Sequence, residues 1–315
     1  MKKFKYLIII FAIVGVLAIG VGFIKGASLK GIAQIYYSDD NYLPKEEIKI
    51  DSSINDLRFE ASYRTISVSV SDKDYSYISY CLVEGSKPLS IRESGNMLSI
   101  NFPNDPISFP YINYKSAPIE VTRINIHLTS EHLLNRLDLK TKSGTIFNSS
   151  NAKFIDVIHS TNSGRIIING IRATSIEVNT NSGGINLNGV DSNTTNLTSK
   201  SGNIIVNSLN SPEQTTINNI NGAIKINNIV SKKVGVVNKN GSVVLTNSDV
   251  IEIQVKTING SINVNQDRSK TTYDAESVNG TIIFYGKKVT SIKDISIGKN
   301  HYILFSTNGS ININN

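Results

Sequence analysis

A chain of 315 residues can bury a substantial core, and its 39% hydrophobic residues, absent tryptophan and frequent Asn, Ile and Ser favour a repetitive β protein over a helical enzyme or a disordered segment. The single cysteine, Cys81, excludes an intramolecular disulfide, and its apolar surroundings predict a buried, unreactive thiol. The net charge of +7 falls to +2 without residues 1–30, because the other 285 residues hold 27 basic and 25 acidic side chains. No arginines alternate with aromatic residues, so nucleic acid is not an expected partner.

The N-terminus carries a membrane signal. Residues 7–24 (LIIIFAIVGVLAIGVGFI) contain no charged side chain, and a helix of that length reaches roughly 27 Å, close to the hydrocarbon thickness of a bilayer. With the lysines before it, this segment predicts a cytoplasmic tail (1–6), a transmembrane signal-anchor (7–24) and a stalk (25–47). The expected location is the cell membrane, single-pass, with the bulk of the chain extracytoplasmic. The alternatives are a signal peptide cleaved after Ala27, which Lys25 disfavours, and the reverse orientation.

Residues 48–135 show strand signals without an evident repeat. The signals fall at 48–50, 65–70, 77–83, 97–102 and 123–128, several of them separated by proline or glycine. We expect a small N-terminal β region that caps the domain after it.

From residue 136 onward, the chain repeats every 19–20 residues. The repeat is a small polar residue, a glycine, any residue and then Ile or Val. The glycines are Gly144, Gly164, Gly183, Gly202, Gly222, Gly241, Gly260, Gly280 and Gly309. Residues two and four after the glycine, and those five before it, are apolar in nearly every copy, so each repeat holds two short strands with alternate side chains facing inward.

The inward positions change parity at the glycine, which a continuous strand cannot do. We therefore expect a corner at each glycine, with the glycine at positive φ. A row of Thr, Ser or Asn three residues before the glycine, such as Thr180, is expected to face inward and bond to the corner backbone or to the next copy. A row of Asn five residues after the glycine, such as Asn188, marks a second corner.

These features predict an all-β fold, a parallel β-solenoid of about nine coils over residues 136–315. A β-propeller fits less well because its blades need about 40 residues. The last spacing of 29 indicates an insertion near 286–298, which we expect to form a partial cap. Because the chain ends six residues after Gly309, the last coil is expected at the exposed end, where self-association is possible if that edge is bare.

The sequence offers no catalytic, cofactor-binding or metal-binding residues and does not identify ligand-binding ones. His127, His132 and His301 lack metal-ligand spacing, and His159 falls in an inward column, where a buried, hydrogen-bonded side chain is expected. The carboxylates are scattered over the repeats: Asp138, Asp156, Glu177, Asp191, Glu252 and Asp274. Any binding patch is expected among the tyrosines before residue 115, since aromatic anchors dominate recognition surfaces. These are Tyr63, Tyr75, Tyr77, Tyr80, Tyr111 and Tyr114.

Three motifs resemble a known family. The stretch L-x-I-x-x-P at 98–103, LDLKTKSGTI at 137–146 and the serial S-G-x-I copies resemble the bacterial putative-adhesin domain family of β-strand-repeat proteins. The repeats depart from that pattern midway, where S-G becomes N-G. The resemblance implies an extracytoplasmic, membrane-tethered solenoid, in some members associated with cell-envelope stress systems, and it supplies no site residues.

The leading functional hypothesis is a non-enzymatic, membrane-anchored, extracytoplasmic β-solenoid that acts in surface binding or adhesion, or as a scaffold or sensor in envelope stress. Its candidate partners are cell-surface carbohydrate and envelope proteins, besides the membrane itself. The first alternative is a polysaccharide-active β-helix enzyme, which would gather carboxylates with Arg or Lys on one face. The second is a polymerising solenoid that faces the cytoplasm.

Overall fold

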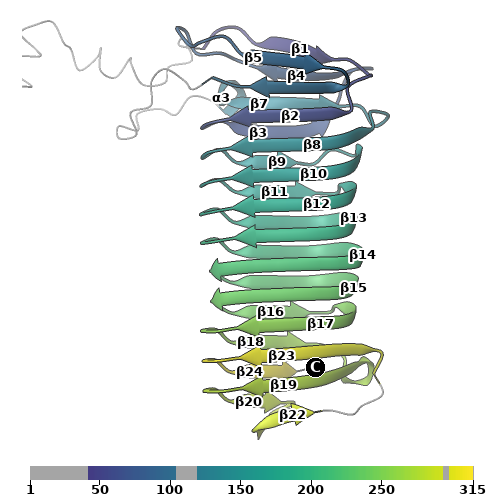
Figure 1. The fold of residues 1–315 in the computed structure, drawn as a ribbon, viewed down its shortest axis with the longest axis vertical. Coiled ribbons are helices and arrows are strands. Elements are labelled where there is room, and N and C mark those ends of the chain that lie inside the picture. Colours follow the sequence, from purple (N-terminus) through teal and green to yellow (C-terminus); the bar gives the residue numbers. More distant parts are fainter. Residues whose placement is uncertain (1–41, 104–118, 294–297, 315) are drawn as a thin grey trace, which may run out of the picture.

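The polypeptide winds into a stack of β coils, each with one strand before and one strand after a corner (Figure 1). The structure is a computed structural model, and it describes residues 42–103, 119–293 and 298–314. The predicted membrane segment, residues 7–24, lies outside the described residues. Within these ranges, no helix has the length and apolar character needed to cross a bilayer.

The strands before the glycines form one parallel wall, and the strands after them form a second. On the first wall, Val157 pairs in register with Leu137 on one side and Ile176 on the other. The strands of the regular coils are β8 (Leu134–Thr141), β9 (Ile146–Asn148), β10 (Lys153–Thr161), β11 (Ile166–Asn169), β12 (Arg172–Thr180), β13 (Ile185–Ser199), β14 (Ile204–Asn221), β15 (Ile224–Asn240), β16 (Val243–Thr246), β17 (Asp249–Thr257) and β18 (Ile262–Asn265). The fold is therefore all-β, and its repeats form a solenoid of parallel coils.

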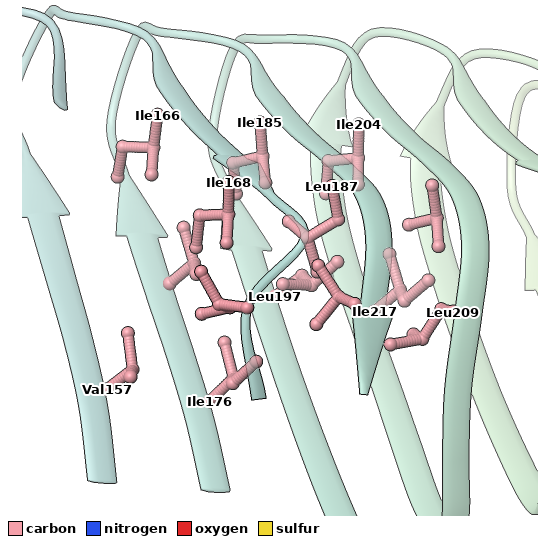
Figure 2. Packing of buried hydrophobic residues seen from close by; sticks show 14 of the residues in the cluster. Val157, Ile166, Ile168, Ile176, Ile185, Leu187, Leu197, Ile204, Leu209 and Ile217 are labelled. Atoms are coloured by element: carbon pink, nitrogen blue, oxygen red, sulfur yellow. The ribbon is translucent and has the colours of Figure 1, made fainter. Parts of the chain in front are cut away.

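The core is the narrow space between the two walls. Figure 2 shows Ile166, Ile185 and Ile204 in a row on one wall, with Leu197 and Ile217 of the other wall below that row in the same core. Each of these five side chains is at most 1% exposed. Burying an aliphatic side chain of this size contributes roughly 1.5–3 kcal/mol, so every coil adds several such increments.

Glycine is required at the repeat positions for a different reason from the one expected. Positive φ was predicted at all nine, but among them only Gly222 and Gly241 have it. What requires glycine at the other seven is close approach: a Cβ at Gly183 would lie 1.5 Å from the carbonyl oxygen of Gly164 in the preceding coil. Positive φ occurs instead at the second corner, six residues after the glycine, for example at Gly189 and Asn228.

The inward polar row supports the glycine corner with hydrogen bonds. The Thr180 hydroxyl accepts a bond from the Gly183 amide at 2.9 Å, and in the next coil the Ser199 hydroxyl donates to the Gly183 carbonyl at 3.2 Å. Longer amide side chains take over further along, where Asn219 Nδ2 donates to the Gly202 carbonyl at 3.0 Å. This row is buried, as expected, and it satisfies backbone groups that the turn leaves unpaired.

Residues 48–135 do more than cap the solenoid. Strands β2 (Asp56–Ala61) and β3 (Thr65–Val70) pair in parallel with β8 and β9, and β6 (Met97–Asn101) and β7 (Arg123–Leu128) pair in parallel with β2 and β3. Two further coils therefore precede the first glycine coil. The coil formed by β2 and β3 lacks the glycine pattern because Arg64 occupies the glycine position at its corner, next to Gly144.

The cap at this end is antiparallel. Strand β4 (Ser76–Tyr80) pairs with β7 and with β1 (Glu46–Ile50), and β5 (Ser90–Ser94) pairs with β6. Tyr42 bridges to Val83, so the described part of the expected stalk, residues 42–47, already belongs to the cap.

The C-terminal coil does not lie at the end of the stack, and the expectation that it would is wrong. Strands β23 (Asn300–Ser306) and β24 (Ile311–Asn314) lie between β17–β18 on one side and β19 (Thr271–Ser277) and β20 (Ile282–Phe284) on the other. The short helix η2 (Arg268–Lys270) leads into β19. The exposed end is the β19–β20 coil, against which β21 (Lys287–Val289) and β22 (Ser291–Lys293) pair antiparallel. The insertion thus occupies an edge that would otherwise present unpaired backbone groups.

Candidate functional site

The structure describes four of the six tyrosines among which any binding patch was expected: Tyr63, Tyr75, Tyr77 and Tyr80. Tyr77 and Tyr80 are 3% and 5% exposed, and their hydroxyls donate to Asp72 and Glu46 at 2.6 and 2.7 Å. Tyr63 is exposed, whereas Tyr111 and Tyr114 lie outside the described residues. Tyr77 and Tyr80 therefore serve the N-terminal cap, where Tyr75 packs edge-on against Tyr77 with the ring centroids 5.9 Å apart.

The scattered carboxylates each have a partner of their own. The pairs are Asp138 with Arg136, Asp156 with Ser175, Glu177 with Asn179, Asp191 with Arg172, Glu252 with Lys233, and Asp274 with His301. In the described part of the chain, no three His, Cys, Asp or Glu side chains come together in a way that could hold a metal.

Two of the histidines have hydrogen bonds that differ from those of a catalytic base. His127 lies between the hydroxyls of Ser69 and Ser79, at 3.2 and 3.4 Å, so neither ring nitrogen faces the orienting carboxylate that a nucleophile–base pair uses. His159 is fully buried, as predicted from its column, with Nδ1 donating to the Ile158 carbonyl at 2.9 Å and Nε2 accepting from Asn148 at 3.1 Å. Burial lowers the pKa of His159 to about 4, so its role is structural.

A hollow on the outer surface of the first wall is the candidate site that we consider, because its lining surface is largely apolar. It has a volume of about 570 Å³ and crosses strands β13, β14, β15, β17 and β23 directly before their glycine corners. Its apolar lining consists of Ile220, Val237, Ile258 and Phe305, of which the first three are 42%, 50% and 45% exposed. We call this hollow the apolar groove. Contiguous exposed apolar surface of this kind marks interaction sites.

The groove is apolar because apolar residues replace polar ones at several positions of two outward-facing rows of side chains. In the row four residues before the glycine, Thr198 and Asn218 are followed across the strands by Val237, Lys256 and Phe305. In the row two residues before it, Ile220 and Ile258 flank Lys239. The amides between these rows point inward, because Asn219 and Asn238 donate to the corner carbonyls. The groove floor is therefore poor in hydrogen-bonding groups.

The charged groups of the groove are all basic. Lys200, Lys239 and Lys256 line it, and its lining contains no carboxylate. None of the three lysines forms an ion pair within the described ranges, whereas other lysines of the solenoid, such as Lys233, do. The groove thus suits an anionic partner.

A second hollow continues the groove toward the N-terminal end of the same wall. Its volume is about 380 Å³, and it shares Thr198 and Lys200 with the groove. Its remaining lining residues are all of polar types, Lys140 and Lys142 with one serine and several threonines and asparagines, although their carbon atoms make up most of the lining surface. We call it the polar hollow. The two together form one trough with an apolar half and a polar, basic half.

Sequence reasoning missed this trough. Each outward column, taken in chain order, alternates in type and suggests no site. The signal appears only when two neighbouring columns are combined and the last coil is placed beside β17, which brings Phe305 next to Lys256.

The sequence of the cap and of the first coils matches a known protein family. The sequence profile described as Toastrack DUF4097 matches residues 45–214, more than half of the chain. The chain belongs to the Toastrack family. The match covers the N-terminal cap, the two coils before Gly144 and the first glycine coils, and it confirms the expected kinship with a putative-adhesin family of unassigned biochemical function.

Solved structures are similar to this chain at low sequence identity. A putative adhesin from Parabacteroides merdae is 11% identical, with a TM-score of 0.51, and the alignment covers 86% of this chain and 95% of that one. A putative adhesin and a putative lipid binding protein, both from Parabacteroides distasonis, are 12% and 18% identical, with TM-scores of 0.45 and 0.46; the alignments cover 86% and 87% of this chain and 96% and 97% of those. No curated protein matches the sequence.

Proposed function

We propose that this Toastrack protein is a non-enzymatic binding protein of the cell envelope. Residues 7–24 anchor it in the membrane, the coils lie outside the cytoplasm, and the apolar groove holds an anionic, partly apolar component of the envelope. The observation that carries the proposal is the groove itself: exposed apolar side chains from neighbouring coils beside three lysines that form no ion pair with any described residue, and no carboxylate in the lining.

The separate pairing of the six scattered carboxylates supports binding rather than catalysis. A glycosidase needs two carboxyls that flank one bond.

The first test concerns location. Intact cells that produce the full chain are treated with an external protease, and the chain is then followed by immunoblot. We expect cleavage within the coils; full protection of the coils would show that they face the cytoplasm.

The second test concerns the groove. Cells that carry the full chain, Val237→Asp or the control Val230→Asp are washed over immobilised envelopes of the same cells, and the retained cells are counted. Val230 is also in β15 and 47% exposed but lies outside the groove, so the two variants place the same charge on similarly exposed positions. We expect Val237→Asp alone to reduce retention, by about tenfold if the introduced carboxylate costs 1.4 kcal/mol. Equal retention by all three would contradict a role for the groove.

A further inference from the structure

The trough has the polarity of an amphiphile. Its apolar half runs from Ile220 to Phe305, and its polar half holds Lys140, Lys142 and amide and hydroxyl side chains. The halves meet at Thr198 and Lys200, which line both. A ligand that lies along the whole trough therefore needs a hydrocarbon part and a polar part joined end to end.

The length of the apolar half limits the length of the hydrocarbon part of the ligand. From Ile220 to Phe305 the apolar half crosses four adjacent strands, β14, β15, β17 and β23. Three strand spacings of about 4.8 Å give roughly 14 Å, which one acyl chain can follow. The groove floor is poor in hydrogen-bonding groups because the Asn219 and Asn238 amides bond inward, so hydrocarbon loses few hydrogen bonds by covering it.

The charges orient the ligand. Lys140, Lys142 and Lys200 line the polar hollow, where the Glu60 carboxylate is 3.8 Å from Lys140 Nζ. At the opposite end, the strand partners of Phe305 are Lys256 and Glu276, whose charges offset each other. The excess of positive charge is therefore at the first end, which attracts an anionic head and leaves the chain end of the ligand at Phe305.

The size and chemistry of the polar hollow favour a phosphate head with hydroxyl groups over a bare carboxylate. Its volume of about 380 Å³ exceeds what one carboxylate fills. Lys200 lies where the two hollows meet and Lys142 lies three strand spacings away, roughly 14 Å, so a phosphate at Lys200 leaves room for a longer head. Amide and hydroxyl side chains, such as Asn162 and Ser160, can exchange hydrogen bonds with hydroxyls of the head. We propose that the trough binds one single-chain anionic phospholipid, with its acyl chain in the apolar groove, its phosphate at Lys200 and the rest of its head extending toward Lys142. This rests on the proposed function and names the ligand class of its groove.

The test is photo-crosslinking of the full chain in phosphatidylcholine nanodiscs. The probe is lysophosphatidylglycerol with a diazirine on its acyl chain, and the crosslinked peptides are identified by mass spectrometry. We expect labels on the groove positions of β14, β15, β17 and β23. Val237→Asp should lower their yield about tenfold, the factor that 1.4 kcal/mol of lost binding produces, while Val230→Asp should leave it unchanged.

Lys200→Glu and Lys142→Glu test the head. Each should reduce labelling by the phosphatidylglycerol probe, and the matching lysophosphatidylcholine probe should label the wild type less. A diazirine fatty acid that labels the groove equally well, with no effect of either lysine variant, would overturn the phospholipid head. Labels spread evenly over all strands, or equal in Val237→Asp and Val230→Asp, would overturn the site itself. If Val237→Asp abolishes cell retention but no probe labels the groove, the surface-binding function stands and the ligand class is wrong.

Discussion

At the scale of single residues, glycine is required at the repeat positions because the backbones of successive coils are in contact there. Replacing Gly183 with alanine would place a Cβ 1.5 Å from the Gly164 carbonyl oxygen, so the backbones of two coils must separate. We expect Gly183→Ala to lower the free energy of unfolding by at least about 3 kcal/mol. The control is Gly235→Ala in β15, where a Cβ meets nothing within 4 Å and φ is not positive; it should change stability by less than about 1 kcal/mol, in the stabilising direction. Urea denaturation of both variants, followed by circular dichroism, checks this, and equal losses would contradict the contact argument.

His159 makes the stability of the coils depend on pH. Burial lowers its pKa in the folded protein from 6.5 to about 4, so the unfolded chain binds the proton first as the pH falls. The stability contributed by the neutral ring is complete above about pH 6.5 and is lost progressively between pH 6.5 and 4, to a total of about 3 kcal/mol. Because carboxylates titrate in the same range, the measurement is the difference between wild type and His159→Leu in denaturation series at pH 7.5, 6, 5 and 4.

His159→Leu should cost about 1–3 kcal/mol at pH 7.5, because Asn148 Nδ2 loses its buried acceptor. That deficit should shrink or reverse toward pH 4. Parallel pH profiles for the two proteins would show that His159 does not titrate as its burial requires.

At the scale of strands and corners, much of the fold could be predicted from the sequence. The inward columns, the corner at each glycine and the inward hydrogen-bonding row all follow from local periodicity. The reason for the glycine could not be derived, because positive φ and close approach both select glycine and only the spacing between coils distinguishes them. The first two coils were missed because Arg64 stands at a corner without a glycine and because the cap strands interrupt their order.

The change from S-G to N-G along the repeats also has a structural explanation. The asparagines before the later glycines form a ladder on the surface, in which Asn240 Nδ2 donates to Asn221, Asn259 to Asn240 and Asn308 to Asn259, at 2.8, 2.8 and 2.9 Å. Asn279 donates to Asn308 at 2.8 Å and completes it. Serine is too short to span adjacent strands in this way. The ladder follows the order of the coils in space, not their order in the chain.

At the scale of the whole molecule, the candidate site depends on that spatial order. Phe305 enters the apolar groove only because the last coil lies between β17 and β19. A sequence read in chain order instead places Glu276 beside Lys256, which would put a carboxylate in the groove and remove its aromatic side chain. The local pattern predicts every coil of this end but not their sequence along the axis, because parallel coils of similar pattern can pair with one another in more than one order.

Engineered disulfides distinguish the two orders. In a chain with Cys81→Ala, the pair Lys256→Cys and Phe305→Cys lies on adjacent strands, about 4.8 Å apart, within the range that a disulfide spans. The pair Lys256→Cys and Glu276→Cys is separated by the inserted coil, at roughly 9.6 Å, beyond the limit of about 7 Å. After mild oxidation and denaturation, thiol titration should find the first pair oxidised and the second free. Oxidation of the second pair but not the first would mean that the coils stack in chain order, and that the apolar groove ends at Lys256 rather than at Phe305.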